Sequence, residues 1–225
     1  MSNKNQTTLS YFISILFILT SLILCIELLC FNTSFMNFIQ SHITLFDKSI
    51  TEYIGIDNDE LIKLDDATLN VILGKEYDEA IINKYMSEKE IMHLIDCNEL
   101  NNKALFVLGI SATVLVISIV MFVKKKCSVN LLYTAFKKSV IGTFFVFLFL
   151  ILFAAIDFYT FWTTFHNIVF PGNDRWLLSY SSDVLLMMVP QQFFEVLVGS
   201  IIFLFIIVII CALIILRNIR KKIYD

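Results

Sequence analysis

Four long apolar runs constrain this chain more than any other feature of its sequence. They cover residues 11–31, 104–123, 140–161 and 193–216. Each is long enough to cross a hydrocarbon core about 30 Å thick, which takes roughly 20 apolar residues in a helix. The runs are continuous and lack the alternating pattern of a barrel strand. With 58% hydrophobic and only 16% charged residues, the chain is predicted to be an all-α, polytopic membrane protein with four transmembrane helices.

The charges of the chain are segregated by sign, which predicts its orientation. Residues 124–139 carry five lysines and no acid, and residues 217–225 carry four Lys or Arg. Cytoplasmic loops are enriched in these cations, so we expect both segments, together with residues 1–10, to be cytoplasmic. Residues 32–103, with fourteen Asp or Glu against six Lys, and residues 162–192 then lie outside. The formal net charge is −3, and the sequence contains no basic stripe of the kind that binds nucleic acid.

The first apolar run is interpreted as a retained anchor. It is longer than the core of a signal peptide, which is about 7–15 residues, and no small-residue cleavage site follows it. Of the five cysteines, only Cys97 falls in the predicted external portion. No structural disulfide is therefore expected.

Residues 32–103 are predicted to form a small helical extracytoplasmic domain. Asp57 followed by Glu60 is typical of a helix start, and Gly74 can end that helix. Ser87 and Glu90 have the spacing of a capping box, in which each side chain satisfies the other residue's backbone N–H. The helix that begins there is predicted to carry His93 towards the outer end of the second span.

Residues 162–192 form an external loop unlike an ordinary polar one, because many of its side chains are apolar or aromatic. Rings of this kind gather where a membrane meets water, so the loop is predicted to lie at the outer interface. Within it, Pro171 to Asp174 has the composition of a turn in which Gly or Asn supplies a positive φ. Pro190 suits the first turn of the fourth span, where its missing N–H costs nothing.

The three histidines, His42, His93 and His166, all fall in the predicted external portion. An imidazole exchanges a proton near neutral pH, as acyl transfer to an amine or water requires. His93 and Asp96 are three residues apart on one helix face, so the carboxylate could orient the ring. The alternative is that His93 is an interfacial side chain and Asp96 a solvated one. His42 has no evident partner and is interpreted as structural.

The turn after His166 could fold Asp174 and Arg175 back towards that histidine. Arg175 is a permanent cation with a forked set of donors, able to hold an ester carbonyl, an oxyanion or a phosphate. The alternative is that Arg175 and Trp176 only anchor the loop at lipid headgroups. Three further acids lie within or at the edges of spans and could be functional, could reach the interface or could pair between helices: Glu27, Asp157 and Glu195.

Two signature segments resemble the bacterial lipoprotein intramolecular transacylases, the Lit family. One runs from Phe165-His166 through Asn173-Asp174-Arg175-Trp176 to Val189-Pro190-Gln191-Gln192. The other runs from Ser87 through His93 to Asp96. The match departs from the family pattern at Leu94 and Cys97, and at the Pro171-Gly172 pair ahead of the Asn-Asp pair. With the four-span layout, the resemblance covers most of the chain.

The resemblance implies an enzyme that moves the sn-2 acyl chain of a diacylglyceryl-modified lipoprotein onto the α-amine of its own amino-terminal cysteine, which produces the lyso form. It implies catalytic roles for His93 and His166. In our hypothesis one histidine deprotonates the amine and the other protonates the departing glycerol oxygen. The supporting residues are then Asp96 and Asp174 as orienting groups, Arg175 or Asn173 near the oxyanion, and Trp176 in contact with substrate.

Two other readings of the sequence remain. A non-enzymatic membrane helper or sensor would tolerate replacement of both histidines. A metal-dependent membrane hydrolase would need clustered His and Asp ligands, but no HExxH or paired CxxC spacing is present. We expect no cofactor and no metal, diacylated bacterial lipoproteins and membrane lipid as partners, no nucleic acid, and a monomer. The expected location is the bacterial cell membrane, with both termini cytoplasmic and the active site facing outside.

Overall fold

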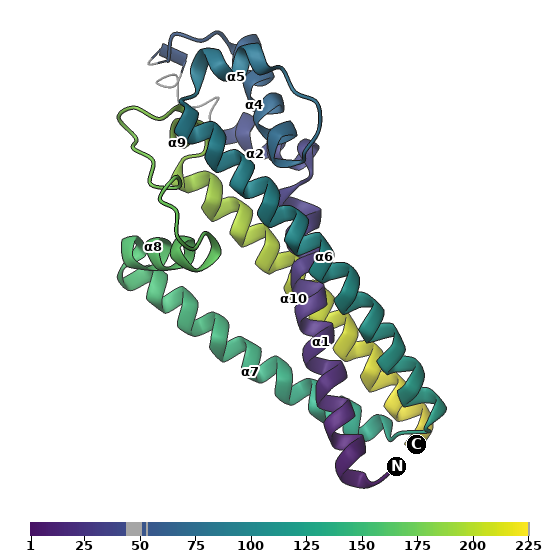
Figure 1. Ribbon diagram of the computed structural model, residues 1–225. Coiled ribbons are helices and arrows are strands. Elements are labelled where there is room, and N and C mark those ends of the chain that lie inside the picture. Colours follow the sequence, from purple (N-terminus) through teal and green to yellow (C-terminus); the bar gives the residue numbers. More distant parts are fainter. Residues whose placement is uncertain (44–50, 53, 225) are drawn as a thin grey trace. The chain divides into compact units, whose positions relative to one another are not determined.

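The computed structural model describes residues 1–43, 51–52 and 54–224. Every regular element in this part of the chain is a helix (Figure 1), which confirms the all-α prediction. The helices are α1 (Asn3–Cys30), α2 (Thr33–Ile43), α4 (Asn58–Ile72), α5 (Glu79–Tyr85), α6 (Glu88–Lys124), α7 (Val129–Ile156), α8 (Phe158–Val169), α9 (Val184–Met188) and α10 (Gln191–Tyr224).

Four of the described helices, α1, α6, α7 and α10, are long and apolar enough to cross a membrane. They contain the predicted apolar runs with two exceptions. Helix α1 ends one residue before the end of the first run, and α7 ends five residues before the end of the third. The predicted external helix and the second span are continuous in α6, which has 37 residues. A helix of that length measures about 55 Å, well beyond the roughly 30 Å of the hydrocarbon core. The first turns of α6, which precede the apolar run 104–123 and carry His93, therefore lie outside the membrane-spanning segment.

The third apolar run is not one helix. Asp157 has a non-helical backbone, with φ −147° and ψ 85°, and it separates α7 from α8. Its carboxylate accepts hydrogen bonds from the backbone N–H of Thr160 at 3.0 Å and from the Thr160 hydroxyl at 2.6 Å, so Asp157 caps α8. The prediction of an uninterrupted helix over 140–161 is thus wrong at its end, because an acid placed in an apolar run starts a new helix.

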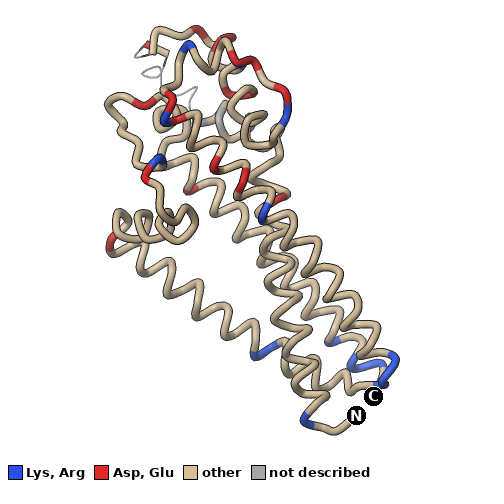
Figure 2. The backbone as a smooth tube through the Cα atoms, in the orientation of Figure 1, with Lys and Arg blue, Asp and Glu red and all other residues tan. Residues whose placement is uncertain are grey.

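The chain divides into two compact units. Unit 1 comprises Met1–Cys25, Phe106–Trp162 and Ile202–Asp225, and unit 2 comprises Ile26–Leu105 and Thr163–Ile201. Unit 1 leaves many large apolar side chains exposed, among them Phe144, Phe145 and Phe149 on α7. Such exposure would be costly in water but suits contact with lipid. In unit 1 most Lys and Arg residues lie near the two chain termini (Figure 2).

Unit 2 contains a hydrophobic core made by α4, α5, α9 and the start of α6. Leu64, Ile82, Leu94 and Met188 are its most buried members. The predicted signals hold locally: the Asp57 carboxylate accepts from the Glu60 N–H at 2.8 Å, and Gly74 follows α4 with a φ of +64°. That left-handed conformation favours glycine, and a Cβ there would also lie 3.0 Å from the Asn98 amide.

Candidate active site

The first turns of α6 place three polar side chains, Glu90, His93 and Asp96, at successive intervals of three residues. Residues so spaced lie near one another along a helix. Glu90 and Asp96 are both buried, and His93 between them is half-buried. The two carboxylates each bind the segment that follows α8, so His93 lies between two attachment points.

Glu90 makes the first attachment. It is only 1% exposed, and its Oε2 accepts from the Ser87 backbone N–H and hydroxyl, both at 2.7 Å. This is the predicted capping box, which the structure confirms. The second oxygen, Oε1, accepts from the backbone N–H of Leu185 at 2.7 Å. The cap of α6 is therefore also the anchor of α9, a role that the local sequence spacing could not indicate.

Asp96 makes the second attachment. Its Oδ1 lies 2.7 Å from Arg175 Nη2 in an ion pair, and its Oδ2 accepts from Asn173 Nδ2 at 3.2 Å. Both oxygens are therefore occupied by the loop. The expectation that Asp96 orients the His93 ring is not what the geometry shows: Asp96 positions Arg175 and Asn173 instead. A further contact to the same segment comes from Lys89, which precedes Glu90 and whose Nζ donates to the Leu177 carbonyl at 2.5 Å.

The turn that brings Arg175 to Asp96 is built as predicted around Gly172, whose φ is +84°. The Asn173 side chain completes it, because its Oδ1 accepts from the Arg175 backbone N–H at 3.2 Å. With one N–H of its amide on Asp96, Asn173 holds the loop, and its place near the oxyanion stays a prediction. Asp174 is exposed, and its orienting role stays a prediction.

His166 lies in the last turn of α8, whereas the sequence places it in a loop just past the third span. It is buried, and its ring stacks on that of Trp176 with centroids 4.7 Å apart and an interplanar angle of 25°. Trp176 Nε1 donates to the Asn173 carbonyl at 3.2 Å. Trp176, expected at the substrate, therefore holds His166 in place through the same turn that binds Asp96.

The two predicted catalytic histidines come together. The ring centroids of His93 and His166 lie 6.2 Å apart. Phe170 contacts both rings, with centroids 5.3 Å from His93 and 5.9 Å from His166. Phe170 was assigned no role from the sequence, although its position four residues after His166 places it next to that ring. A shared proton relay requires two imidazoles within reach of one reacting group, and the distance between the ring centroids is compatible with that requirement.

His93 is held in its neutral form. Burial, together with the charges of His166 and Arg175, lowers the pKa of His93 to about 4. Its Nδ1 is buried without a hydrogen-bond partner, as is Arg175 Nε. Buried polar atoms are normally paired, so one acceptor or donor on His93 and one donor on Arg175 remain available to a substrate.

Cys97 is a further neighbour of His93, and the sequence indicated no role for it. Its Sγ lies 3.9 Å from His93 Nε2, and the spacing of four residues on one helix could have indicated the contact. Burial and the charge of Asp96 raise the pKa of Cys97 to about 12. The thiol therefore stays protonated, and a protonated thiol is a poor nucleophile.

The remaining titratable candidates have environments of their own. His42 is exposed, and its Nδ1 lies 2.7 Å from the Phe38 carbonyl. Asp157 caps α8, Glu195 accepts from Gln191 Nε2 at 2.8 Å, and Glu27 Oε1 is buried without a partner. Within the described ranges, no group of three or more His, Cys, Asp or Glu is placed to hold a metal ion.

Comparison with known proteins identifies the family of the chain. Residues 9–194 match the family described as lipoprotein intramolecular transacylase Lit. No curated protein matches the sequence. The fold is similar to the solved structure of the membrane integral Lit from Bacillus cereus, with a TM-score of 0.71 and 19% identity over 97% of this chain and 96% of that one.

Two further solved structures carry a replacement of one histidine in the same Bacillus cereus protein. The alanine variant gives a TM-score of 0.70 at 18% identity, covering 99% of this chain and 96% of that one. The arginine variant gives 0.69 at 20%, covering 97% and 92%. At these identities the structures show the fold, while the family match covers most of the sequence. The chain therefore belongs to the lipoprotein intramolecular transacylase (Lit) family of membrane acyltransferases.

Proposed function

We propose that this protein transfers the sn-2 acyl chain of a diacylglyceryl-cysteine lipoprotein to the α-amino group of the same cysteine, leaving a lyso-form lipoprotein. The observation that carries the proposal is the pairing of His93 and His166, whose ring centroids lie 6.2 Å apart, together with the Arg175 guanidinium. These are the groups that an ester-to-amide transfer needs: a proton acceptor, a proton donor and a cation for the developing oxyanion.

His93 is proposed as the base. An α-amine has a pKa of about 7.7–8.0, so a useful fraction is already free at neutral pH. When its nitrogen attacks the ester carbonyl, a C–N bond forms, the C=O π bond opens to an oxyanion, and the now positively charged nitrogen becomes more acidic than the ammonium of the free amine. An imidazole with a pKa of about 4 can accept a proton from that adduct although it could not deprotonate the resting ammonium. The unpartnered Nδ1 of His93 is the atom available to accept it.

His166 is proposed as the acid. Collapse of the tetrahedral adduct breaks the C–O bond to glycerol, and the departing oxygen takes a proton from the His166 ring to become a free hydroxyl. The proton received by His93 then passes to His166, directly or through one water, and restores both rings. Trp176, stacked on His166 at 4.7 Å, would keep the donating nitrogen aligned during this step.

Arg175 is proposed to stabilise the oxyanion. Its Nη2 is fixed by Asp96 at 2.7 Å, while its Nε has no protein partner. A donor held in place before the reaction costs little reorganisation when charge develops, and one such donor is typically worth about 10²–10³ in rate. Because ester and amine belong to one substrate molecule, bringing them together supplies much of the remaining acceleration.

The substrate class implies a bacterial cell membrane with both termini in the cytoplasm and the histidines on the outer side. The support for this orientation is the charge of the chain. The basic residues at 124–138 and 217–222 belong to unit 1, and the fourteen acids of residues 32–103 belong to unit 2, an asymmetry typical of cytoplasmic and external segments, respectively.

Expression in bacteria that lack the activity tests the proposal. Mass spectrometry of lipoprotein amino-terminal peptides should detect the lyso form with the intact protein. His93→Ala and His166→Ala should each abolish it while the protein still inserts into the membrane. His42→Ala is the matched control and should form normal product. A normal yield from either His93→Ala or His166→Ala would rule out the paired-histidine assignment and favour a non-enzymatic role for these rings.

A further inference from the structure

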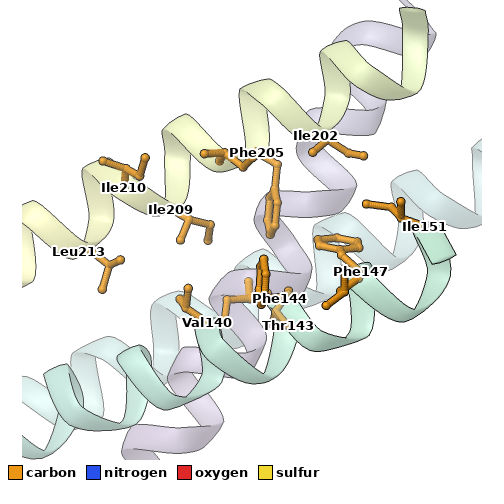
Figure 3. Close-up of a pocket in the computed structure, with 13 residues that line it drawn as sticks. Val140, Thr143, Phe144, Phe147, Ile151, Ile202, Phe205, Ile209, Ile210 and Leu213 are labelled. Atoms are coloured by element: carbon orange, nitrogen blue, oxygen red, sulfur yellow. The ribbon is translucent and has the colours of Figure 1, made fainter. Parts of the chain in front are cut away.

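An apolar cavity of about 320 Å³ lies within unit 1 between α7 and α10, with Ile18 of α1 at one side. Figure 3 shows the side chains of α7 and α10 pointing towards one another, and the Phe147 and Phe205 rings meet edge to face at 5.7 Å. Among the lining residues only Thr143 carries a polar side-chain atom. Its hydroxyl already donates to the Ser139 carbonyl at 3.0 Å, so the cavity offers little to a water molecule.

The length of the cavity matches a single leaflet. Its lining extends along α7 from Val140 to Ile151 and along α10 from Ile202 to Leu213. At the rise of an α-helix, each of these stretches covers about 16 Å, roughly half of the hydrocarbon core. The α7 stretch begins at the first residue of the apolar run 140–161, next to the basic loop, and the α10 stretch ends three residues before the end of the run 193–216, next to the basic tail. A hydrocarbon chain entering from that leaflet would fit the shape and the chemistry of the walls.

The two helix faces that line the cavity continue into a basic and aromatic cluster. On α7, Tyr133 and Lys137 lie seven and three residues before Val140, on the same side of the helix. On α10, Arg220 lies seven residues after Leu213. The faces still meet at this level, because the Arg220 guanidinium lies 4.6 Å from the centre of the Tyr133 ring and Lys137 Nζ lies 5.8 Å from it.

A polar hollow of about 270 Å³ lies at the same end of unit 1, lined by Asn130, Arg220, Lys221 and Tyr224. The Tyr224 hydroxyl is held 3.1 Å from Ser128 Oγ. Unit 1 contains ten Lys or Arg, and within its described residues the single acid is Asp157, at the far end of α7. The cluster therefore carries a positive charge that no nearby described carboxylate offsets, as Figure 2 shows around the chain termini.

We propose that this cavity and hollow together bind one anionic phospholipid of the leaflet next to the chain termini. The acyl chain lies between α7 and α10, and the phosphate contacts Arg220, Lys221 and the neutral donors Asn130 and Tyr224. The positive-inside tendency accounts for cations on this side of the membrane. It does not explain why the cations lie on the same helix faces as the residues that line the apolar cavity. A ligand that contacts both parts of this surface must carry an acyl chain and a negative charge. The inference is independent of the acyltransferase reaction.

Lipid binding to the purified full-length protein tests the proposal. Delipidated protein in detergent is titrated by native mass spectrometry with dioleoylphosphatidylglycerol, and separately with dioleoylphosphatidylcholine. The site predicts one tightly retained phosphatidylglycerol and much weaker phosphatidylcholine. A cation near an anionic headgroup is worth about a factor of five, so Arg220→Gln with Lys221→Gln should weaken phosphatidylglycerol binding at least tenfold. Lys125→Gln with Lys126→Gln removes the same charge from the adjacent loop and should change binding little.

The apolar half of the site needs its own variant. Ile209→Trp adds bulk to the cavity wall and should weaken phosphatidylglycerol binding although every cation is retained; a melting profile like that of the wild type shows that the variant is folded. If that variant does not fold, the smaller change Leu213→Phe takes its place. Equal binding of the two lipids, unchanged binding by the Arg220→Gln, Lys221→Gln protein, or displacement of the lipid by inorganic phosphate would each overturn the proposal.

Discussion

Asp96 and Arg175 form an ion pair at 2.7 Å that joins α6 to the turn after α8. Asp96 is three residues from His93, and Arg175 is next to Trp176, which stacks on His166. A single contact between residues 79 positions apart therefore fixes the position of His166 relative to His93. It also leaves one guanidinium nitrogen unpartnered, so the pair both builds the site and supplies its cation.

Replacement of Asp96 by Ala should lower stability and abolish activity. The Asp96 side chain is 9% exposed and that of Arg175 is 34% exposed, so the mutation leaves a partly buried cation and an amide without their acceptor. Such a loss costs about 1–3 kcal/mol. Glu99→Gln is the control, because its ion pair with Lys103 is exposed and 3.6 Å long, and exposed pairs contribute about 0–1 kcal/mol. The melting temperatures of the two variants in detergent are compared with that of the wild type. An equal decrease for Asp96→Ala and Glu99→Gln would contradict the positioning role of Asp96.

Replacement of Glu90 by Gln should reduce activity and stability together. Three N–H or O–H groups donate to this carboxylate, and an amide presents its own N–H to at least one of them. The expected loss is about 1–3 kcal/mol, with α9 released from α6. Glu88→Gln is the matched control in the same helical turn, because Glu88 is exposed. Hydrogen exchange at the Leu185 amide should accelerate in Glu90→Gln alone; protection unchanged from the wild type would count against the anchor.

The low pKa of His93 predicts a specific pH dependence of stability. In the folded protein this pKa is about 4, below the roughly 6.5 of an unperturbed imidazole. The unfolded chain therefore takes up the proton first, and stability falls as pH drops from about 6.5 towards 4, with no contribution above that range. Melting temperatures of wild type and His93→Gln across this range should show a smaller drop for the variant. A parallel dependence for the two proteins would contradict the buried, neutral state of His93.

Replacement of Cys97 by Ala should leave most of the activity. Cys97 Sγ lies 3.9 Å from His93 Nε2, an arrangement that could suggest a thiol nucleophile and an acyl-enzyme. The pKa of about 12 that burial and Asp96 give this thiol argues for a packing role instead. We expect turnover within a few-fold of wild type and no thioester on the intact protein by mass spectrometry. Loss of activity by a factor of about 10² or more, as expected for a removed catalytic group, would contradict the packing role and indicate that Cys97 is a nucleophile.

Local signals predicted the parts of the fold that depend on neighbouring residues. The apolar runs predicted the four long helices, Asp57 and the Ser87–Glu90 pair predicted two helix starts, and Gly172 predicted the turn. Asp157 was missed because an acid within an apolar run is equally consistent with a side chain that reaches the interface. The hydrogen bond by which it caps α8, from the Thr160 N–H to the Asp157 carboxylate at 3.0 Å, is seen only in the structure.

The site was predicted less completely than the fold, for a physical reason. Spacing on one helix suggested that Asp96 serves His93, but the partner with the better geometry, Arg175, comes from a distant segment. The same applies to Glu90, whose second oxygen binds Leu185, and to Trp176, whose ring packs on His166 rather than facing lipid. Periodicity shows which side chains share a face; it carries no information on which distant segment covers that face.

The most direct test of the paired-histidine reaction follows the acyl chain itself. A diacylglyceryl lipopeptide with an isotopic label only in its sn-2 chain is incubated with the purified protein, and the product is sequenced by tandem mass spectrometry. The paired-histidine reaction predicts that the label moves to the amino-terminal amide, and that His93→Ala and His166→Ala each slow this transfer by about 10² or more. Label released as free fatty acid, or transfer at the wild-type rate in either variant, would contradict it.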